Sequence, residues 1–136
     1  MVKRAVLFER TVGATPQAVA PLRRAVARVA AAAGASADQV ASIQLAVSEA
    51  ISNAVVHAYA HHDAPGPVTV LASIRAAELR VLVCDEGSGM MPRPDSPGLG
   101  LGLPMIANLA TSLDVRVGPQ GDGTEVSMLF PVGQTA

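Results

Sequence analysis

The sequence predicts an α/β (α+β) sandwich, in which a mixed, mostly antiparallel sheet is covered on one face by three helices. Segments with strand and helix periodicity follow one another in the order β-α-α-β-β-α-β-β. Two of the strands are joined by a turn of only three residues, 76–78. So short a turn forces these strands to be antiparallel, which excludes a unit of parallel strands joined by crossover helices. The length of 136 residues is that of one ordinary domain, which we expect to span residues 1–136.

The composition predicts an aliphatic core and excludes several kinds of site. Half of the residues are hydrophobic, but only 2% are aromatic. A formal net charge of -1 and the lack of a Lys/Arg run argue against binding nucleic acid through a basic patch. The single cysteine, Cys84, excludes an internal disulfide and a Cys-based zinc site. Because no apolar stretch reaches the roughly 18 residues of a membrane span and no cleavable signal is visible, we expect a soluble cytoplasmic protein.

The first two elements are a strand and a helix. Residues 4–10 alternate as a strand does. Thr15 then provides a helix cap and a proline follows it at the first helical position. This helix should run to about residue 33 and end at Gly34, a residue type common just after a helix. Its basic residues form either a solvated face or a contact surface for an acidic partner; they are Arg23, Arg24 and Arg28.

A second, central helix is predicted from about residue 37 to residue 60, with Ser36 or Asp38 as its cap. Glu49, Asn53 and His57 follow one another in it at intervals of four residues. Four residues is slightly more than one turn, so we expect the three side chains on one face.

The same helix is apolar over most of its circumference, and we therefore expect it to be buried. Buried carboxylate, amide and imidazole groups need partners. Two interpretations remain open from this stretch alone: a satisfied polar seam between packed elements, or a site that holds a metal ion and a reacting group.

The remaining segments complete the sheet. Residues 68–75 and 79–85 are predicted as the antiparallel hairpin. A third helix is expected at about residues 103–112, followed by strands at residues 113–117 and 124–130. The last of these strands alternates strictly between apolar and polar residues.

Three glycine-bearing motifs carry the functional signal, although each by itself fits an ordinary turn or hinge. Residues 85–89, with the pattern D-x-G-x-G, end a buried strand. Their aspartate can accept a hydrogen bond from an exocyclic amine, and their glycines let a flat ring approach the backbone. Residues 98–102 (GLGLG) precede a helix, where free backbone N–H groups can bind an anion. Residues 121–124 (GDGT) form a turn whose threonine can add a hydroxyl donor.

In this order, the polar helix face and the three motifs resemble the GHKL (histidine-kinase-like) ATPases. That group includes gyrase, heat-shock chaperone, mismatch-repair and histidine-kinase ATP domains. The resemblance covers residues 35–130 and implies the GHKL fold with ATP as cofactor. The matching positions are Glu49 and Asn53 in the N-box, Asp85, Gly87 and Gly89 in the next box, and Gly98, Gly100 and Gly102 in the glycine-rich box.

Within that group, the run GLGLGLPMIANLATSLDV looks like the bacterial anti-sigma-factor kinases of partner-switching systems. The resemblance implies a homodimer that binds ATP and Mg²⁺ and holds a sigma factor. It also implies phosphorylation of a serine or threonine on an anti-anti-sigma (STAS-type) protein. Neither direct nucleic-acid binding nor a membrane is implied.

The same resemblance implies a role for each matching residue. Glu49 would be the catalytic base that takes the hydroxyl proton, and Asn53 would hold Mg²⁺ on the phosphates. Asp85 would bind the adenine amino group, with Thr124 helping at that end. The other cofactor-binding positions are Gly87 and Gly89 near the base, and Gly98, Leu99, Gly100, Leu101 and Gly102 around the phosphates.

One segment departs from the family pattern. The expected lid, about residues 90–97, is short and rich in proline, and Arg93 is its only basic residue. Relatives often have a longer lid with a basic residue, and without such a cation phosphoryl transfer loses electrostatic help. ATP binding is therefore better supported than turnover. The alternatives are a non-catalytic, ATP-dependent regulator of a sigma factor and, with less support, a detached histidine-kinase ATP domain.

Overall fold

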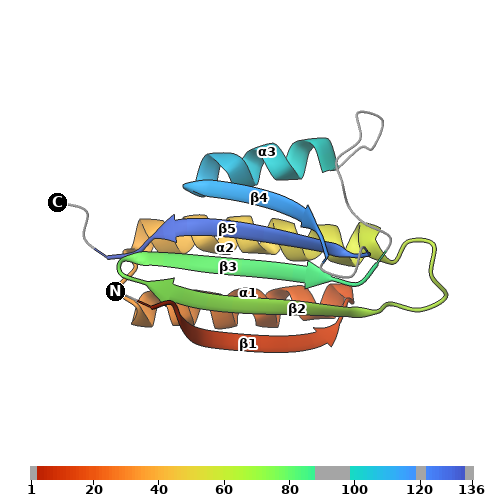
Figure 1. Cartoon of the computed structure of the whole chain (residues 1–136), viewed down its shortest axis with the longest axis horizontal. Coiled ribbons are helices and arrows are strands. Elements are labelled where there is room, and N and C mark those ends of the chain that lie inside the picture. Colours follow the sequence, from red (N-terminus) through yellow and green to blue (C-terminus); the bar gives the residue numbers. More distant parts are fainter. Residues whose placement is uncertain (1–2, 88–98, 119–121, 134–136) are drawn as a thin grey trace.

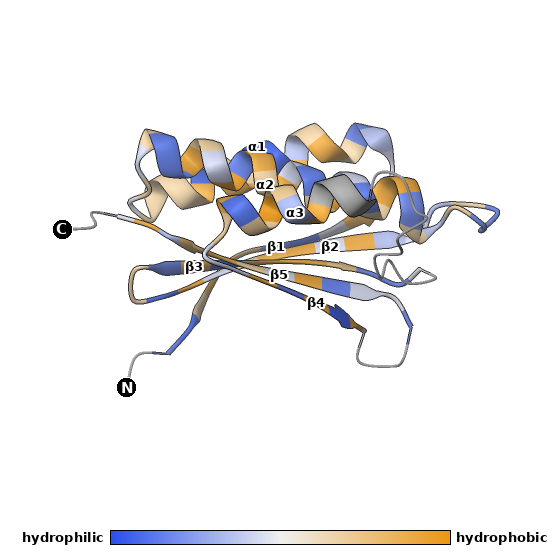
Figure 2. Ribbon diagram, turned by 90° about the horizontal axis from the view of Figure 1, so that it is seen from above, coloured by the Kyte–Doolittle hydropathy of each residue, from blue (hydrophilic) through white to orange (hydrophobic). Residues whose placement is uncertain are grey.

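The protein consists of a sheet and a layer of helices. The computed structural model describes residues 3–87, 99–118 and 122–133, and for residues 99–102 it describes the backbone alone. Figure 1 looks onto the sheet with α1 and α2 behind it, and Figure 2 shows the helices together on one side of the sheet. The predicted sandwich, with helices on one face, is confirmed. No helix in the described part of the chain is long and apolar enough to cross a membrane.

The sheet is antiparallel at every described pairing, so the mixed character that the sequence left open is not seen there. The five strands lie in the order β1-β2-β3-β5-β4. The predicted hairpin is formed by β2 and β3. The register sets the end of β3 opposite the start of β5, so that Asp85 pairs with Thr124. The strands are β1 (Ala5–Gly13), β2 (Pro67–Arg75), β3 (Glu78–Asp85), β4 (Ser112–Val117) and β5 (Thr124–Pro131).

The helices begin where the sequence places them except for the last one. A capping box starts α2, because Ser36 and Gln39 each bond the other's backbone N–H. After Asn53 the helix widens into a π-helical turn instead of continuing as an α-helix to residue 60. The helices are α1 (Pro16–Ala32), α2 (Ala37–Asn53), the π-helix η1 (Ala54–Ala58) and α3 (Leu99–Leu109).

The third helix starts four residues before its expected position, at Leu99 rather than Leu103. The low helix propensity of glycine favoured a loop over residues 98–102. In the folded protein Leu103 and Ile106 of α3 are buried against the rest of the core. Tertiary packing of this kind stabilises a helix against weak local propensity. The glycine-rich residues 99–102 therefore form the first turn of α3.

The core lies between the two layers and is aliphatic, as the composition predicts. The strands turn every second side chain toward the helices, as in Val81 and Val83 of β3. Polar side chains are rare in this interior. Among the described residues, those that are buried are Asn53, Ser73, Asp85 and Thr124, and three of these four are predicted site residues.

Candidate functional site

Asp85, at the end of β3, is a buried carboxylate that is only half paired. Its side chain is 6% exposed. Oδ1 accepts a hydrogen bond of 3.0 Å from the backbone N–H of Gly87. Oδ2 is buried and has no hydrogen-bond partner in the described part of the protein. Burial raises the pKa of Asp85, while the backbone N–H groups of Gly87 and Thr124 act in the opposite direction. An acceptor in this state is ready for a donor from outside the chain.

Gly87 and Gly123 allow η1, the end of β3 and the start of β5 to approach one another closely around Asp85. A Cβ on Gly87 would lie 2.0 Å from the carbonyl oxygen of Ala58, at the end of η1. Gly123 has a positive φ of 74°, a conformation that glycine adopts readily, and its N–H bonds the Gly87 carbonyl at 3.0 Å. A side chain at position 87 would therefore clash with the backbone at the end of η1.

Tyr59, which the sequence did not single out, connects the backbone segments around Asp85. Its hydroxyl donates to the carbonyl of Pro67 at 2.6 Å and accepts from the backbone N–H of Glu86 at 2.8 Å. The ring is buried, and a Cβ on Gly66 would lie 2.4 Å from it. One side chain therefore connects the end of η1 to β2 and β3. The available signal was that this is the only tyrosine of the chain and lies just before a Pro-Gly turn.

Asn53 and Glu49 lie on α2, one turn apart, as predicted. Asn53 is the last residue of α2 and is 6% exposed, and its Nδ2 is buried without a hydrogen-bond partner in the described part. Glu49 is half-buried. His57, which the sequence placed on the same face of one continuous α-helix, lies instead in the π-helical turn η1 and is half-buried.

The predicted residues come together at one end of the molecule. Figure 1 shows the end of β3, the start of β5, the end of α2 with η1, and the first turn of α3 at the same side. Asp85 meets Thr124 through strand pairing and Gly87 through the hydrogen bond from its N–H to Oδ1. Leu99, Gly100, Leu101 and Gly102 form the first turn of α3, where backbone N–H groups have no partner within the helix. Gly89, Gly98 and the expected lid lie outside the described residues.

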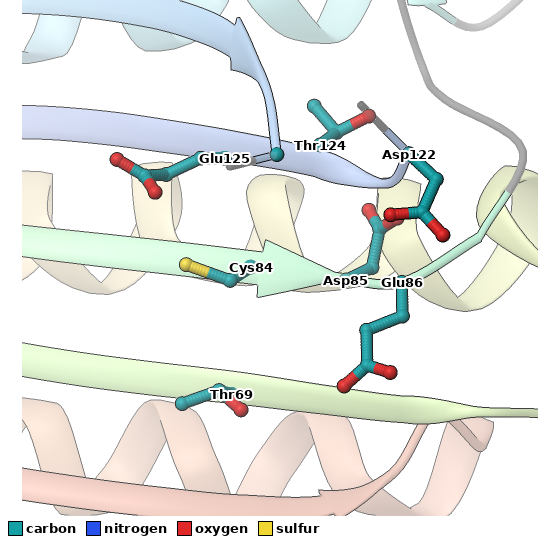
Figure 3. A pocket seen from close by; sticks show the side chains of 8 residues that line it. Thr69, Cys84, Asp85, Glu86, Asp122, Thr124 and Glu125 are labelled. Atoms are coloured by element: carbon teal, nitrogen blue, oxygen red, sulfur yellow. The ribbon is translucent and has the colours of Figure 1, made fainter. Parts of the chain in front are cut away.

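A pocket of about 400 Å³ opens beside Asp85, a volume within the usual range of small-molecule sites. In Figure 3 the Asp85 side chain points toward Thr124 and Asp122, whereas Glu86 points toward β2. Neither Lys nor Arg is among the described residues that line this pocket, and its carboxylates favour a ligand edge rich in hydrogen-bond donors. The lining residues are Thr69, Cys84, Asp85, Glu86, Gly118, Asp122, Thr124 and Glu125.

Two other chemistries are not supported by the described part of the site. Burial raises the pKa of Cys84 to about 11, so its thiol is protonated at neutral pH and is a weak nucleophile. No group of three or more His, Cys, Asp or Glu side chains in the described part is arranged to hold a metal ion.

The sequence of residues 12–130 matches the family model of the histidine kinase-like ATPase domain. The chain belongs to this family. The resemblance to the GHKL ATPases is thereby confirmed, and the domain is an ATP-binding, kinase-like one by family and fold. The comparison with curated proteins gave no match.

Two solved structures resemble this ATPase domain. One contains the RsbU and RsbW domains of Rv1364c from Mycobacterium tuberculosis; it is 25% identical, with a TM-score of 0.70 over 95% of this chain and 34% of that one. The other is the histidine kinase domain of the blue-light activated histidine kinase EL346 from Erythrobacter litoralis, 26% identical, with a TM-score of 0.58 over 82% of this chain and 61% of that one. The chain thus spans about a third of the first structure and three fifths of the second.

Proposed function

We propose that this domain is an anti-sigma factor that binds ATP with Mg²⁺ and phosphorylates a serine or threonine of an anti-anti-sigma, STAS-type partner. The observation that carries the proposal is a pair of buried polar atoms, Asp85 Oδ2 and Asn53 Nδ2, that have no hydrogen-bond partner among the described residues and lie at the site end of an ATPase fold. Buried polar groups are rarely left unpaired, and a nucleotide offers partners to both. The likeness of the sequence to anti-sigma-factor kinases and of the fold to the RsbU and RsbW domains supports the partner-switching role.

At the adenine end, Asp85 would select the base. Its Oδ2, which has no partner among the described residues, can accept a hydrogen bond from the exocyclic amino group, a donor that guanine lacks at the same position. Thr124 lies opposite Asp85 in the sheet and would complete this end, and Gly89 would follow along the same loop. Tyr59 would keep Asp85 at a fixed place by holding the backbone of Glu86.

At the phosphate end, Asn53 would supply a neutral oxygen to Mg²⁺ and its Nδ2 to a phosphate oxygen. Mg²⁺ is usually bound by few protein ligands together with substrate phosphates, which agrees with a site that has no cluster of ligating side chains in its described part. The backbone N–H groups of the first turn of α3, from Leu99 to Gly102, would bind the phosphates, with Gly98 preceding them.

Glu49 would act as the general base. It lies one turn before Asn53 on α2 and is half-buried, so a partner's hydroxyl can reach it from solvent. The carboxylate would accept the hydroxyl proton while the γ-phosphoryl group passes to the oxygen. The active form is proposed to be a homodimer in the cytoplasm.

A second candidate function is favoured by the scarcity of cations. Arg93 is the only basic residue between Arg80 and Arg116, and the described pocket beside Asp85 has no Lys or Arg in its lining. Charge that develops during phosphoryl transfer is usually stabilised by such groups. A domain that binds ATP without turnover and holds its sigma factor in an ATP-dependent way fits this observation.

Calorimetry followed by a transfer assay tests the proposal. We expect ATP with Mg²⁺ to bind with a Kd of about 1–100 µM. Labelled phosphate should then pass from ATP to one of the STAS-type proteins of the same organism when each is tested separately. Absence of any ATP binding would contradict the nucleotide site. Binding of ATP and of a STAS-type partner without transfer to any of them would support the non-catalytic regulator instead.

A further inference from the structure

A cluster of arginines lies on the face of the sheet that no described helix covers, at the end formed by the β2–β3 turn. Figure 2 shows the described helices together on the other face, and Figure 1 places this turn at the end of the sheet opposite the nucleotide site. Because residues 79 and 81 of β3 are buried in the core, the side chain of Arg80 between them points away from the helices. Asp85 lies five residues further along the same strand, about 16 Å away by the rise of a β-strand. The cluster is therefore separate from the nucleotide site.

The β2–β3 turn brings the charged side chains of this cluster together. Arg75 at the end of β2 pairs with Glu78 at the start of β3, and the next pair on the same face is Ser73 with Arg80. Arg4, just before β1, reaches both pairs. Its Nη1 donates to the carbonyl and hydroxyl oxygens of Ser73 at 3.3 and 3.4 Å, and its Nη2 lies 3.5 Å from Glu78 Oε1. Three guanidinium groups thus share one carboxylate.

The positive charges of the cluster are not balanced within the described part of the chain. Neither Arg75 nor Arg80 makes an ion pair there. The contact of Arg4 with Glu78 is a loose one, and the Glu78 side chain remains 42% exposed. Burial and the nearby guanidinium groups of Arg80 and Arg75 lower the pKa of Arg4, whereas Glu78 acts in the opposite direction. An anion placed among the three arginines would offset their mutual repulsion.

Arg80 also carries a donor that lacks an acceptor. Its Nε is buried and has no hydrogen-bond partner among the described residues. Buried N–H groups are rarely left without an acceptor. The Nε and a neighbouring Nη of a guanidinium can together bind two oxygens of one phosphate or carboxylate group. An oxyanion seated against Arg80 would supply the missing acceptor, and Ser73, which is 2% exposed, adds a hydroxyl beside it.

We propose that Arg4, Arg75 and Arg80 form a second anion site, which binds a phosphate group, either inorganic phosphate or the monoester of a small molecule. On binding, the guanidinium of Arg4 exchanges Glu78 for oxygens of the ligand. The site does not depend on ATP binding or on phosphoryl transfer, because all of these residues lie at the other end of the sheet from Asp85.

The number of donors and the charge of the surrounding face select this ligand. A phosphate monoester presents three acceptor oxygens, whereas a carboxylate presents two, and guanidinium groups approach here from three segments of the chain. Glu9 and Glu125 lie on the same face, because each pairs with a residue that points away from the helices. These carboxylates repel a long polyanion. A compact ligand is therefore favoured over a nucleic acid, whose affinity depends on many phosphate contacts.

Titration of the full chain, followed by the NMR chemical shifts of its backbone amides, locates the site. Inorganic phosphate, added in place of chloride at constant pH and ionic strength, should bind with a Kd of about 1 mM. The largest saturable shifts should occur at residues 73–80. Phenyl phosphate distinguishes the two sources, because tighter binding than that of phosphate indicates a monoester and equal or weaker binding indicates the inorganic ion. Shifts that do not saturate at residues 73–80 with either compound would overturn the proposal.

Two substitutions with opposite expected effects separate ligand binding from a structural role. Arg80→Gln should weaken phosphate binding by about tenfold, because a charged donor pair is lost. Glu78→Gln should strengthen it by about threefold, since the carboxylate that competes for Arg4 is removed. If Arg80→Gln does not fold, Arg75→Gln at an exposed position provides the test of a lost guanidinium. A loss of affinity in Glu78→Gln would contradict the exchange at Arg4.

The matched control is Arg28→Gln, which removes the same charge from an exposed position on α1. It should leave the affinity for phosphate unchanged. An equal loss in Arg28→Gln and Arg80→Gln would show that net charge and not a built site controls binding, and would overturn the proposal. ATP affinity, measured by calorimetry, should be the same in Arg80→Gln as in the parent. A matching loss of ATP affinity would show that the arginines do not form a separate site.

Discussion

The polar groups at the N-terminal end of α2 are hydrogen-bonded, whereas a side-chain amide at its C-terminal end has no full set of partners among the described residues. At the N-terminus, Ser36 Oγ accepts from the Gln39 N–H at 3.1 Å, and Gln39 Oε1 accepts from the Ser36 N–H at 2.8 Å. Gln39 also bonds the backbone of Gly133. At the C-terminus, the amide of Asn53 is buried and its Nδ2 has no hydrogen-bond partner in the part of the chain that the structure describes, and the backbone continues into a π-helical turn.

We interpret this difference as one between residues that stabilise the fold and residues that bind a ligand. A reciprocal cap satisfies donors that the helix cannot satisfy itself. A buried amide without a partner costs folding free energy, and a ligand that pairs with it would recover that cost. Wide π-helical turns are found disproportionately at functional sites. We therefore expect substitutions at the C-terminal end to change ligand binding and chemistry, and substitutions at the N-terminal end to change stability alone.

The largest effect is expected from Glu49→Gln. If Glu49 is the base, labelled-phosphate transfer to the partner should fall by about 10²–10⁴-fold, the usual contribution of general base catalysis. Glutamine keeps the size of the side chain but cannot accept a proton at neutral pH. Calorimetry should show unchanged ATP affinity. Equal transfer rates in parent and variant would make Glu49 a structural carboxylate.

Asn53→Ala should follow in size. In the presence of Mg²⁺ we expect ATP affinity to fall by about 10–100-fold, because the metal loses an oxygen ligand. Titrations with EDTA in place of Mg²⁺ provide the comparison, and there the loss should be smaller. Equal losses under both conditions would show that Asn53 acts through packing and not through the metal.

Asp85→Asn should weaken ATP binding by about tenfold, since a charged acceptor is replaced by a neutral amide. The same change should make the protein more stable at neutral pH. Burial raises the pKa of Asp85 in the folded state, so this carboxyl contributes stability below its unfolded pKa of about 3.9. That contribution is lost as pH rises through the raised folded value.

Urea denaturation of the parent and of Asp85→Asn at several pH values tests the predicted direction of this pH dependence of stability. The free energy of unfolding of the variant, relative to the parent, should increase from acid to neutral pH. Calorimetry with ATP and GTP measures base selection, and the preference of the variant for adenine should be relaxed. A variant with unchanged ATP affinity and unchanged preference would show that Asp85 does not bind the base.

Ser36→Ala should have the smallest effect and is the control for the other end of α2. Loss of the cap should reduce the free energy of unfolding by about 1 kcal/mol, measured by urea denaturation. ATP affinity should stay that of the parent because the capping box lies at the opposite end of the helix. A matching loss of ATP affinity would remove the distinction between the two ends.

The sequence by itself determined the features that depend on neighbouring residues. The order of strands and helices, the β2–β3 hairpin and the shared face of Glu49 and Asn53 follow from periodicity, turn length and residue preferences, which also narrowed the cap of α2 to Ser36 or Asp38. These signals act over one or two turns of helix or a few residues of strand. The family resemblance likewise followed from motifs that are local in the chain, and residues 12–130 match that family.

Only the tertiary structure decided the features that join distant segments. Tyr59 acquires its role from Glu86, 27 residues away, and Asp85 meets Thr124 only through the β3–β5 register. Burial of Leu103 and Ile106 accompanies an α3 that begins at Leu99. Which polar groups lack a partner among the described residues, as Asp85 Oδ2 and Asn53 Nδ2 do, depends on every neighbour that packing brings near. Such contacts are set by the free energy of the whole fold, which no local pattern contains.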